Sequence, residues 1–124
     1  MSSEVRGLEP RSVWNHFADL NAVPRPSKKE ERVIQFMVDF GNSLGLPTEV
    51  DHIGNVFIRK PATSGMEART PVVLQAHLDM VHQKNNDTDF DFDTQGIDMY
   101  VDGDWVKARG TTLGADNGMG VAYI

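Results

Sequence analysis

The sequence contains no cysteine. Disulfide bonds and thiolate zinc sites are therefore excluded, and a bound metal would have to be held by histidine and carboxylate side chains. An excess of basic residues is also missing, because 18 acidic side chains outnumber 12 basic ones and give a formal net charge of −6. Nucleic acids and anionic membranes attract clustered lysine and arginine, so we expect the protein to bind neither.

Export and membrane signals are absent as well. The start of the sequence, MSSEVRGLEP, has no basic segment followed by an apolar one, and the chain nowhere shows about 18 consecutive apolar residues. We therefore expect a cytoplasmic protein without a membrane span. With 124 residues, 40% of them hydrophobic, the chain is long enough for one globular domain and too short for two.

Hydrophobic spacing predicts two amphipathic helices in the first third of the chain. The first lies in RSVWNHFADLNAV, where apolar residues recur on one helical face until Pro24 stops the helix. The second is expected to begin at a capping box formed by Ser27 and Glu30 and to end at Gly45.

Three further stretches are typical of strands. TEVDHIGNVFIRK predicts two short strands around Gly54 and Asn55, and MYV and WVKA predict a hairpin around Asp102-Gly103. PVVLQA, residues 71–76, is an apolar run of the kind found in a central strand that is covered on both faces.

His77 and Asp79 follow this predicted central strand, at the end where open α/β sheets bind their ligands. Residues two apart in an extended segment share a face, so both side chains can enter one pocket. A histidine can bind a divalent metal through one ring nitrogen while the other donates to a carboxylate that fixes the ring. The alternative interpretation is a structural histidine in a loop beside an ordinary turn carboxylate.

Asp116 lies in the glycine-rich stretch RGTTLGADNGMG, directly before a predicted helix that starts near Asn117. One interpretation is a helix N-cap, for which aspartate is among the best residues. The other is a metal ligand that bridges two ions about 3.5–4 Å apart, an arrangement favoured by the close backbone approach that glycine permits. The chain stops inside this helix without a cap or a polar tail, so we expect it to be a fragment.

QAHLDMV together with RGTTLGADNGMG resembles the di-zinc aminoacylase and carboxypeptidase family of metallopeptidases. KPATSGMEARTPVVLQAHLDMVHQKNNDTDFDF and DGDWVKARGTTLGADNG are similar, more narrowly, to its aminoacyl-histidine dipeptidase branch. The resemblance implies an α/β fold. Residues 1–124 would be the amino-terminal part of a three-layer α/β/α catalytic domain of the zinc-exopeptidase kind, with a mixed central sheet. The lid domain through which the family commonly forms homodimers would be absent.

The resemblance also implies roles for individual residues. His77 matches a zinc ligand, Asp116 the carboxylate that bridges two zinc ions, and Asp79 the catalytic residue that orients and polarises His77. Cobalt or manganese can substitute for zinc in this expectation. The peptide bond between Asp116 and Asn117 is expected to be cis. The other histidines, expected to be surface or structural residues, are His16, His52 and His82.

The implied reaction is metal-dependent hydrolysis of dipeptides, preferentially Xaa-His dipeptides such as β-alanyl-histidine, by a water molecule that zinc activates. In the family the general base is the first of two adjacent glutamates, and no glutamate follows Glu67 here, so we expect this chain to be inactive alone. Two alternatives stay open. One is a related aminoacylase or tripeptidase, and the other is a non-catalytic α/β binding module whose acidic loop, Asp87 to Asp93, engages a cationic partner.

Overall fold

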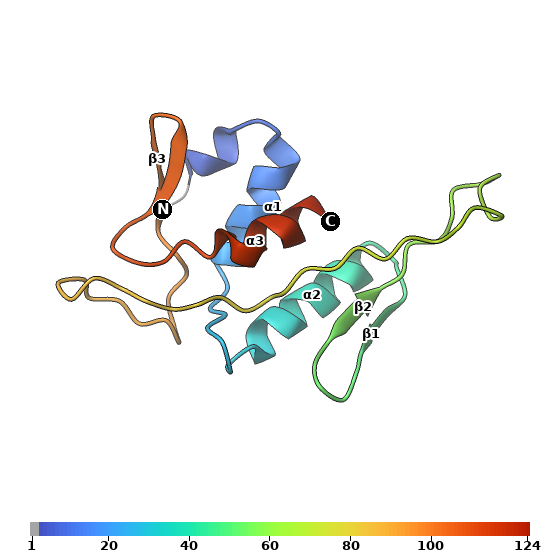
Figure 1. The fold of residues 1–124 in the computed structure, drawn as a ribbon, viewed down its shortest axis with the longest axis horizontal. Helices are drawn as coiled ribbons and strands as arrows, with labels where there is room; N and C mark the ends of the chain where they lie inside the picture. The colour runs from blue at the N-terminus through green and yellow to red at the C-terminus, as the bar shows by residue number, and fades with distance from the viewer. Residues whose placement is uncertain (1–2) are drawn as a thin grey trace. The chain divides into compact units, whose positions relative to one another are not determined.

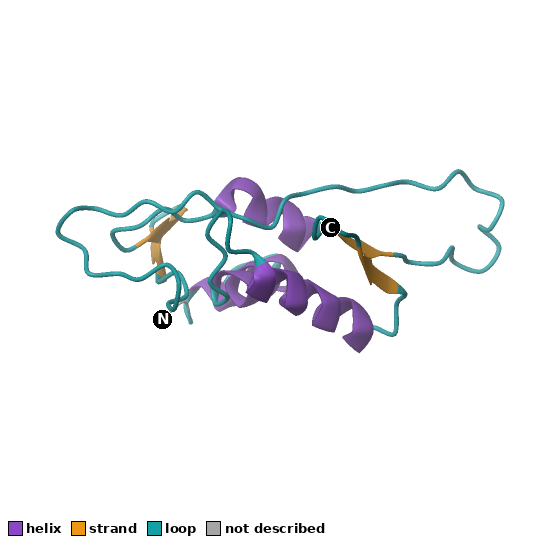
Figure 2. Cartoon of the chain, turned by 90° about the horizontal axis from the view of Figure 1, so that it is seen from below, coloured by secondary structure: helices purple, strands orange, loops and turns teal. Residues whose placement is uncertain are grey.

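A computed structural model describes residues 3–124 of the chain. These residues form two compact units, one made of the chain up to Val33 together with Gln75–Ile124, and the other of Ile34–Leu74. Figure 1 follows the path of the chain, and Figure 2 distinguishes its helices from its strands and loops. Helices and short strands occur in both units, as expected of an α/β protein.

The first unit contains a short 3-10 helix, two α-helices and one hairpin, together with the first residues of helix α2. Its elements are η1 (Val5–Gly7), α1 (Arg11–Asn21), β3 (Met99–Asp102), β4 (Trp105–Ala108) and α3 (Ala115–Tyr123). The second unit contains the rest of α2 (Glu31–Ser43) and the strands β1 (Thr48–Val50) and β2 (Val56–Ile58).

Helix α1 forms where the hydrophobic spacing predicted it. Its apolar face buries Phe17 and Leu20, and it packs beside α3 (Figure 1). The two helices come close because α3 carries Gly118 at the contact, where a Cβ atom would lie 2.9 Å from the Phe17 ring. The buried residues of the core are Val5, Phe17, Ala18, Met80, Ile97, Met99 and Ala122.

The β3–β4 hairpin is present, but its turn lies one residue later than predicted. Asp102 pairs with Trp105 in the antiparallel register, so the turn consists of Gly103 and Asp104. Gly103 has φ +59°, a conformation that glycine adopts without steric cost. The glycine therefore occupies the first turn position.

The predicted capping box at the start of α2 is wrong. The helix begins at Glu31, and the Glu30 carboxylate accepts a hydrogen bond from the backbone N–H of Lys28 (2.9 Å). The Ser27 hydroxyl donates to Asp79 instead of capping the helix. Local spacing cannot detect this outcome, because the competing acceptor lies 52 residues further along the chain.

The predicted end of α2 is confirmed. Gly45 has φ +68°, and its N–H donates to the Asn42 carbonyl (2.9 Å), while the N–H of Leu46 donates to the Gly41 carbonyl (3.1 Å). This pair of bonds is the Schellman motif, in which a left-handed glycine closes the helix.

The hairpin β1–β2 in the second unit is confirmed too. Its strands pair antiparallel, with Val50 opposite Val56. Asp51 closes the turn, because its Oδ1 accepts hydrogen bonds of 2.9 Å from the backbone N–H groups of Ile53, Gly54 and Asn55.

The strand predicted at residues 71–76 does not form. The segment is extended but unpaired, and Val72, Val73 and Leu74 are 78%, 90% and 64% exposed. A strand needs neighbours that accept and donate its backbone hydrogen bonds. Residues 3–124 provide only two separate two-stranded sheets and two isolated bridges. No helix among these residues is long and apolar enough to cross a membrane.

Candidate metal centre

The three predicted site residues lie together in the first unit. His77 and Asp79 are on the extended segment that leads to Met80, and Asp116 is at the start of α3. His77 Nε2 is 3.0 Å from Asp116 Oδ1. His77 Nδ1 is 3.1 Å from Asp79 Oδ1 and 3.0 Å from the Asp79 carbonyl oxygen. Two stretches 39 residues apart in sequence therefore meet at one imidazole ring.

Asp116 does not act as a helix cap. The first turn of α3 is kinked, because Asp116 (φ −95°, ψ 99°) and Asn117 (φ −120°, ψ 31°) are not helical, and the Asp116 side chain is 94% exposed and reaches His77. The predicted cis peptide bond between Asp116 and Asn117 is confirmed. Asn117 Oδ1 accepts a hydrogen bond from the backbone N–H of His77 (3.3 Å), which adds a second link between the two stretches.

Asp79 uses its two carboxylate oxygens for different partners. Oδ1 faces the imidazole, and Oδ2 accepts a hydrogen bond of 2.5 Å from the Ser27 hydroxyl. The Ser27 hydrogen bond lowers the pKa of Asp79, the positive charge of His77 lowers it further, and partial burial opposes both without reversing the shift. Asp79 is therefore an anion at neutral pH, held in place from both sides.

His77 is placed between two carboxylates. Partial desolvation lowers its pKa, but the hydrogen bond to Asp116 and the contacts with Asp79 outweigh that effect, so the pKa of His77 is raised above its ordinary value. Its side chain is 49% exposed. The ring is thus oriented by charge-assisted hydrogen bonds and still open to solvent.

Arg25 is a further component of the site that the sequence interpretation missed. It is 1% exposed, and its guanidinium donates to the carbonyl oxygens of Leu78 (3.0 Å) and Gly114 (2.9 Å) and to Asn21 Oδ1 (2.6 Å). Burial lowers the pKa of Arg25 to about 10, with the negative charge of Asp79 opposing the decrease. The available signal is an arginine between two prolines shortly after a helix, a pattern that by itself indicates only the end of the helix.

The donor set agrees in kind with a divalent transition metal. One imidazole nitrogen of His77 and one carboxylate oxygen of Asp116 face each other, and zinc accepts both kinds of ligand. A catalytic zinc ion usually has three protein ligands, and no group of three or more His, Cys, Asp and Glu residues within residues 3–124 is arranged to hold a metal. Residues 3–124 by themselves therefore do not contain a complete site of this kind.

The other histidines lie elsewhere. His16 is on the exposed side of α1, and His52 is in the exposed turn of the β1–β2 hairpin. The ring of His82 packs edge-on against Phe92, with 5.7 Å between centroids.

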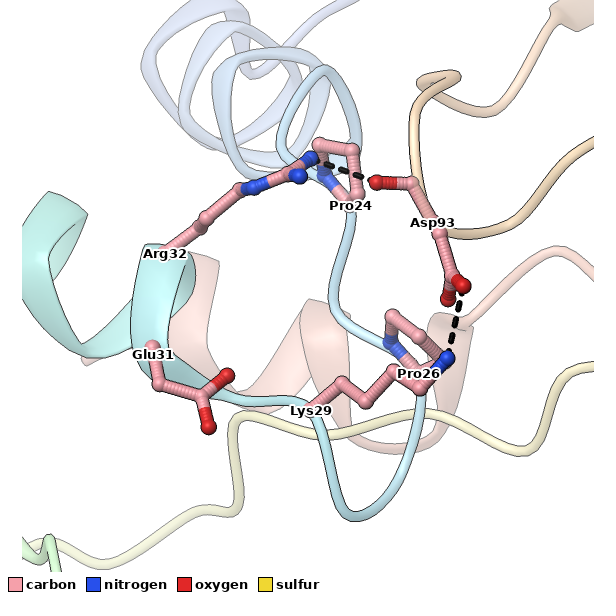
Figure 3. Close-up of a pocket in the computed structure, with 6 residues that line it drawn as sticks. All are labelled: Pro24, Pro26, Lys29, Glu31, Arg32 and Asp93. Carbon is pink, nitrogen blue, oxygen red and sulfur yellow. Dashed lines mark hydrogen bonds and ion pairs between the residues drawn. The ribbon is translucent and has the colours of Figure 1, made fainter.

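A shallow pocket of about 220 Å³ is separate from these residues (Figure 3). Both of its cationic side chains already contact Asp93. Lys29 Nζ is 2.6 Å from the Asp93 carboxylate, and Arg32 donates to the Asp93 carbonyl oxygen at 2.6 Å (Figure 3). Both cations of the pocket are thus paired within the chain, and none of the three site residues lines it.

No family model matches the sequence. The chain is 56% identical over 120 residues to the cytosol non-specific dipeptidase of Escherichia coli (strain K12). It is similar in sequence to a dipeptidase. Its structure also matches the crystal structure of aminoacylhistidine dipeptidase from Vibrio alginolyticus, with a TM-score of 0.93 and 52% sequence identity.

The predicted resemblance to the dipeptidases is therefore confirmed, and with it the α/β fold class. Both matches cover 97% of this chain. They cover only 25% of the Escherichia coli dipeptidase and 24% of the Vibrio alginolyticus dipeptidase. The chain thus spans about a quarter of the length of each dipeptidase that it matches.

Proposed function

We propose that this chain is the amino-terminal, metal-holding part of a dipeptidase that hydrolyses Xaa-His dipeptides such as β-alanyl-histidine. The observation that carries the proposal is the position of the His77 ring, with Nε2 facing Asp116 and Nδ1 facing Asp79. A histidine that binds a metal typically holds a carboxylate or carbonyl with its other nitrogen, as this arrangement allows. The identity of 56% to a dipeptidase supports dipeptides as the substrate class.

In this proposal His77 and Asp116 hold two divalent metal ions, which are zinc, with cobalt or manganese as substitutes. When bound, the metal would polarise the scissile carbonyl and activate water. Asp79 accepts the proton of His77 Nδ1 in a hydrogen bond and so leaves Nε2 directed at Asp116. The Asp116 side chain is 94% exposed, so its carboxylate remains accessible to a second ion.

In this proposal the chain needs the remainder of the enzyme for activity. The family resemblance makes the general base one of two adjacent glutamates, and no glutamate follows Glu67 in this chain. The exposed apolar residues 72–74 are consistent with a sheet strand whose neighbours belong to the remainder. The complete enzyme would be cytoplasmic, as the name of the Escherichia coli relative supports, and a homodimer, which rests on the family resemblance alone.

A non-catalytic module with a cationic partner has less support. Asp91 accepts hydrogen bonds from the Asp93 N–H and the Thr94 hydroxyl, and Asp93 pairs with Lys29 at 2.6 Å. The carboxylates of Asp91 and Asp93 are thus paired within the chain, so the acidic loop presents less unpaired negative charge to a cationic partner than its composition indicates. A related aminoacylase or tripeptidase is the alternative within the same family.

The proposal is tested by measuring hydrolysis of β-alanyl-histidine with added zinc, with and without a chelator. We expect no turnover by this chain alone and chelator-sensitive turnover by the protein of the complete reading frame. An acetylated amino acid and a tripeptide, assayed in parallel, distinguish the aminoacylase and tripeptidase alternatives. His77→Ala should abolish turnover, and His52→Ala, in an exposed turn, is the matched control. Turnover by the chain alone, or a complete protein that cleaves no dipeptide, would contradict the proposal.

A further inference from the structure

The segment from Pro24 to Ser27 touches both stretches that form the candidate centre. Arg25 Nη1 donates to the carbonyl of Leu78, the residue between His77 and Asp79. Arg25 Nη2 donates to the carbonyl of Gly114, two residues before Asp116. One side chain therefore links the backbone on the two sides of the site.

The backbone and the hydroxyl of the same segment add to this link. The Met80 N–H donates to the Arg25 carbonyl (3.0 Å), and the Ser27 N–H donates to the Met80 carbonyl (3.1 Å), which makes a short parallel bridge. The Ser27 hydroxyl donates to Asp79 Oδ2. We call residues 25–27 the brace.

The environment of Arg25 leaves little room for another side chain. A Cβ atom at Gly114 would lie 2.6 Å from Arg25 Nη2, and one at Gly118 would lie 2.7 Å from the same atom. Asn21 holds the guanidinium from the side of α1, and its Nδ2 donates to the Leu113 carbonyl (2.9 Å). The planar fork of arginine can reach acceptors on three different segments at once, whereas a lysine ammonium is a single point charge.

Stability alone is a weak reason for this arrangement. A buried guanidinium loses its hydration, and apolar residues of similar volume often stabilise a protein as well or better. Arg25 Nε, moreover, is a buried polar atom without a hydrogen-bond partner among residues 3–124. Arg25 lies between the segment that carries His77 and Asp79 and the segment that carries Asp116. This position indicates a role at the candidate centre.

We propose that Arg25 and Ser27 are positioning residues that set the separation of His77 from Asp116 and the orientation of Asp79. The inference rests on the proposed dipeptidase function and deepens it. Neither residue touches the reacting atoms. Both act through the backbone or the carboxylate that they hold.

The test compares two substitutions in the brace with two matched control substitutions, all made in the complete protein. Arg25→Lys keeps the charge and loses the fork, and Ser27→Ala removes one hydroxyl without a large cavity. Arg6→Lys is the matched arginine control, because Arg6 joins η1 to α1 through Asn15 and Asp19 away from the centre. Ser43→Ala is the matched serine control, since its hydroxyl donates to the Phe40 carbonyl at the exposed end of α2.

We expect Arg25→Lys and Ser27→Ala to lower kcat about 10- to 100-fold, the range typical of outer-shell partners of a metal site. KM should change less, and zinc affinity measured by calorimetry with the metal alone should fall. Ser27→Thr, which restores a hydroxyl, should recover most of the loss. The two control variants should retain the wild-type kcat and zinc affinity.

A spectroscopic readout separates the brace from the proposed function. In protein labelled with ¹⁵N-histidine, the His77 ring signals should shift in Arg25→Lys and Ser27→Ala and stay unchanged in the two controls. Unshifted His77 signals with wild-type kcat in both brace variants would overturn the inference. If the wild-type protein cleaves no dipeptide, the proposed function fails, and the His77 signals alone then decide for or against the brace.

Discussion

At the scale of single residues, the two carboxylates beside His77 differ mainly in exposure. Asp79 is 35% exposed and is held by Ser27, whereas Asp116 is 94% exposed and contacts the imidazole of His77. A carboxylate held by other groups is suited to orient a ring, and an open one is suited to bind an ion. The same residue type therefore has two roles, decided by what surrounds it.

Asp79→Ala is predicted to weaken zinc binding or lower the rate of the complete enzyme about 10- to 100-fold, because His77 loses the partner that fixes its ring. Calorimetric zinc titration and the kcat for β-alanyl-histidine measure the two effects. Asp98→Ala is a matched control, since Asp98 is 34% exposed and pairs with Arg109 instead. Wild-type affinity and rate in Asp79→Ala would show that Asp79 has no such role.

At the scale of elements, local chemistry and long-range contacts decide different features. The end of α2 and the β1–β2 turn follow from glycine and aspartate acting within a few residues, so the sequence predicted them correctly. The start of α2 and the strand at residues 71–76 were predicted wrongly. In both, the deciding hydrogen bonds involve residues far away along the chain, or neighbouring strands that residues 3–124 do not contain.

The turn closed by Asp51 is predicted to weaken in acid. The side-chain hydrogen bond from Asn55, and then backbone N–H groups, hold the pKa of Asp51 below its ordinary value of 3.8. A lowered carboxyl pKa contributes stability that is present above 3.8 and is lost as the pH falls through the folded-state value. The turn should therefore weaken as the pH falls below 3.8 and through the folded-state pKa of Asp51.

The amide proton shift of Gly54, followed by NMR from pH 6 to pH 2, measures this opening, and thermal unfolding measures the matching loss of stability. Asp51→Asn keeps an acceptor oxygen and cannot titrate, so its Gly54 signal should lack the acid transition. If Asp51→Asn shows the same transition as the wild type, another group is responsible.

At the scale of the whole molecule, the chain exposes an apolar run that no described residue pairs with. Val72, Val73 and Leu74 are more than half exposed and lie on an extended segment. An unpaired extended apolar edge is a template for pairing with another chain. We therefore expect copies of this chain to associate with one another through residues 72–74.

Val73→Lys is predicted to reduce self-association of this chain, because Val73 is 90% exposed and a lysine there adds charge to the unpaired edge. Sedimentation velocity over a range of concentrations measures the change. Ile53→Lys is the control, since Ile53 is a comparably exposed apolar residue (75%) in a hairpin turn. If Val73→Lys associates as strongly as the wild type, residues 72–74 do not mediate self-association.

Much of the candidate site could be predicted from motifs. His77, Asp79 and Asp116 were predicted as one constellation, and the structure brings them within hydrogen-bond distance. The roles of these residues as metal ligands and orienting group stay predictions. Arg25 was missed because its partners are carbonyl groups of Leu78 and Gly114, which any residue type supplies, so no side-chain pattern indicates them.

The sequence by itself determined the helix α1, the closing turns at Gly45 and Asp51, the resemblance to dipeptidases and the identity of the candidate metal-holding residues. These features depend on side-chain type and on spacing over a few positions. Only the tertiary structure decided that Ser27 leaves the helix start to hold Asp79, that Arg25 is buried between the two arms of the centre, and that residues 71–76 stay unpaired. Each of those outcomes depends on backbone groups distant in sequence, and only folding brings such groups together.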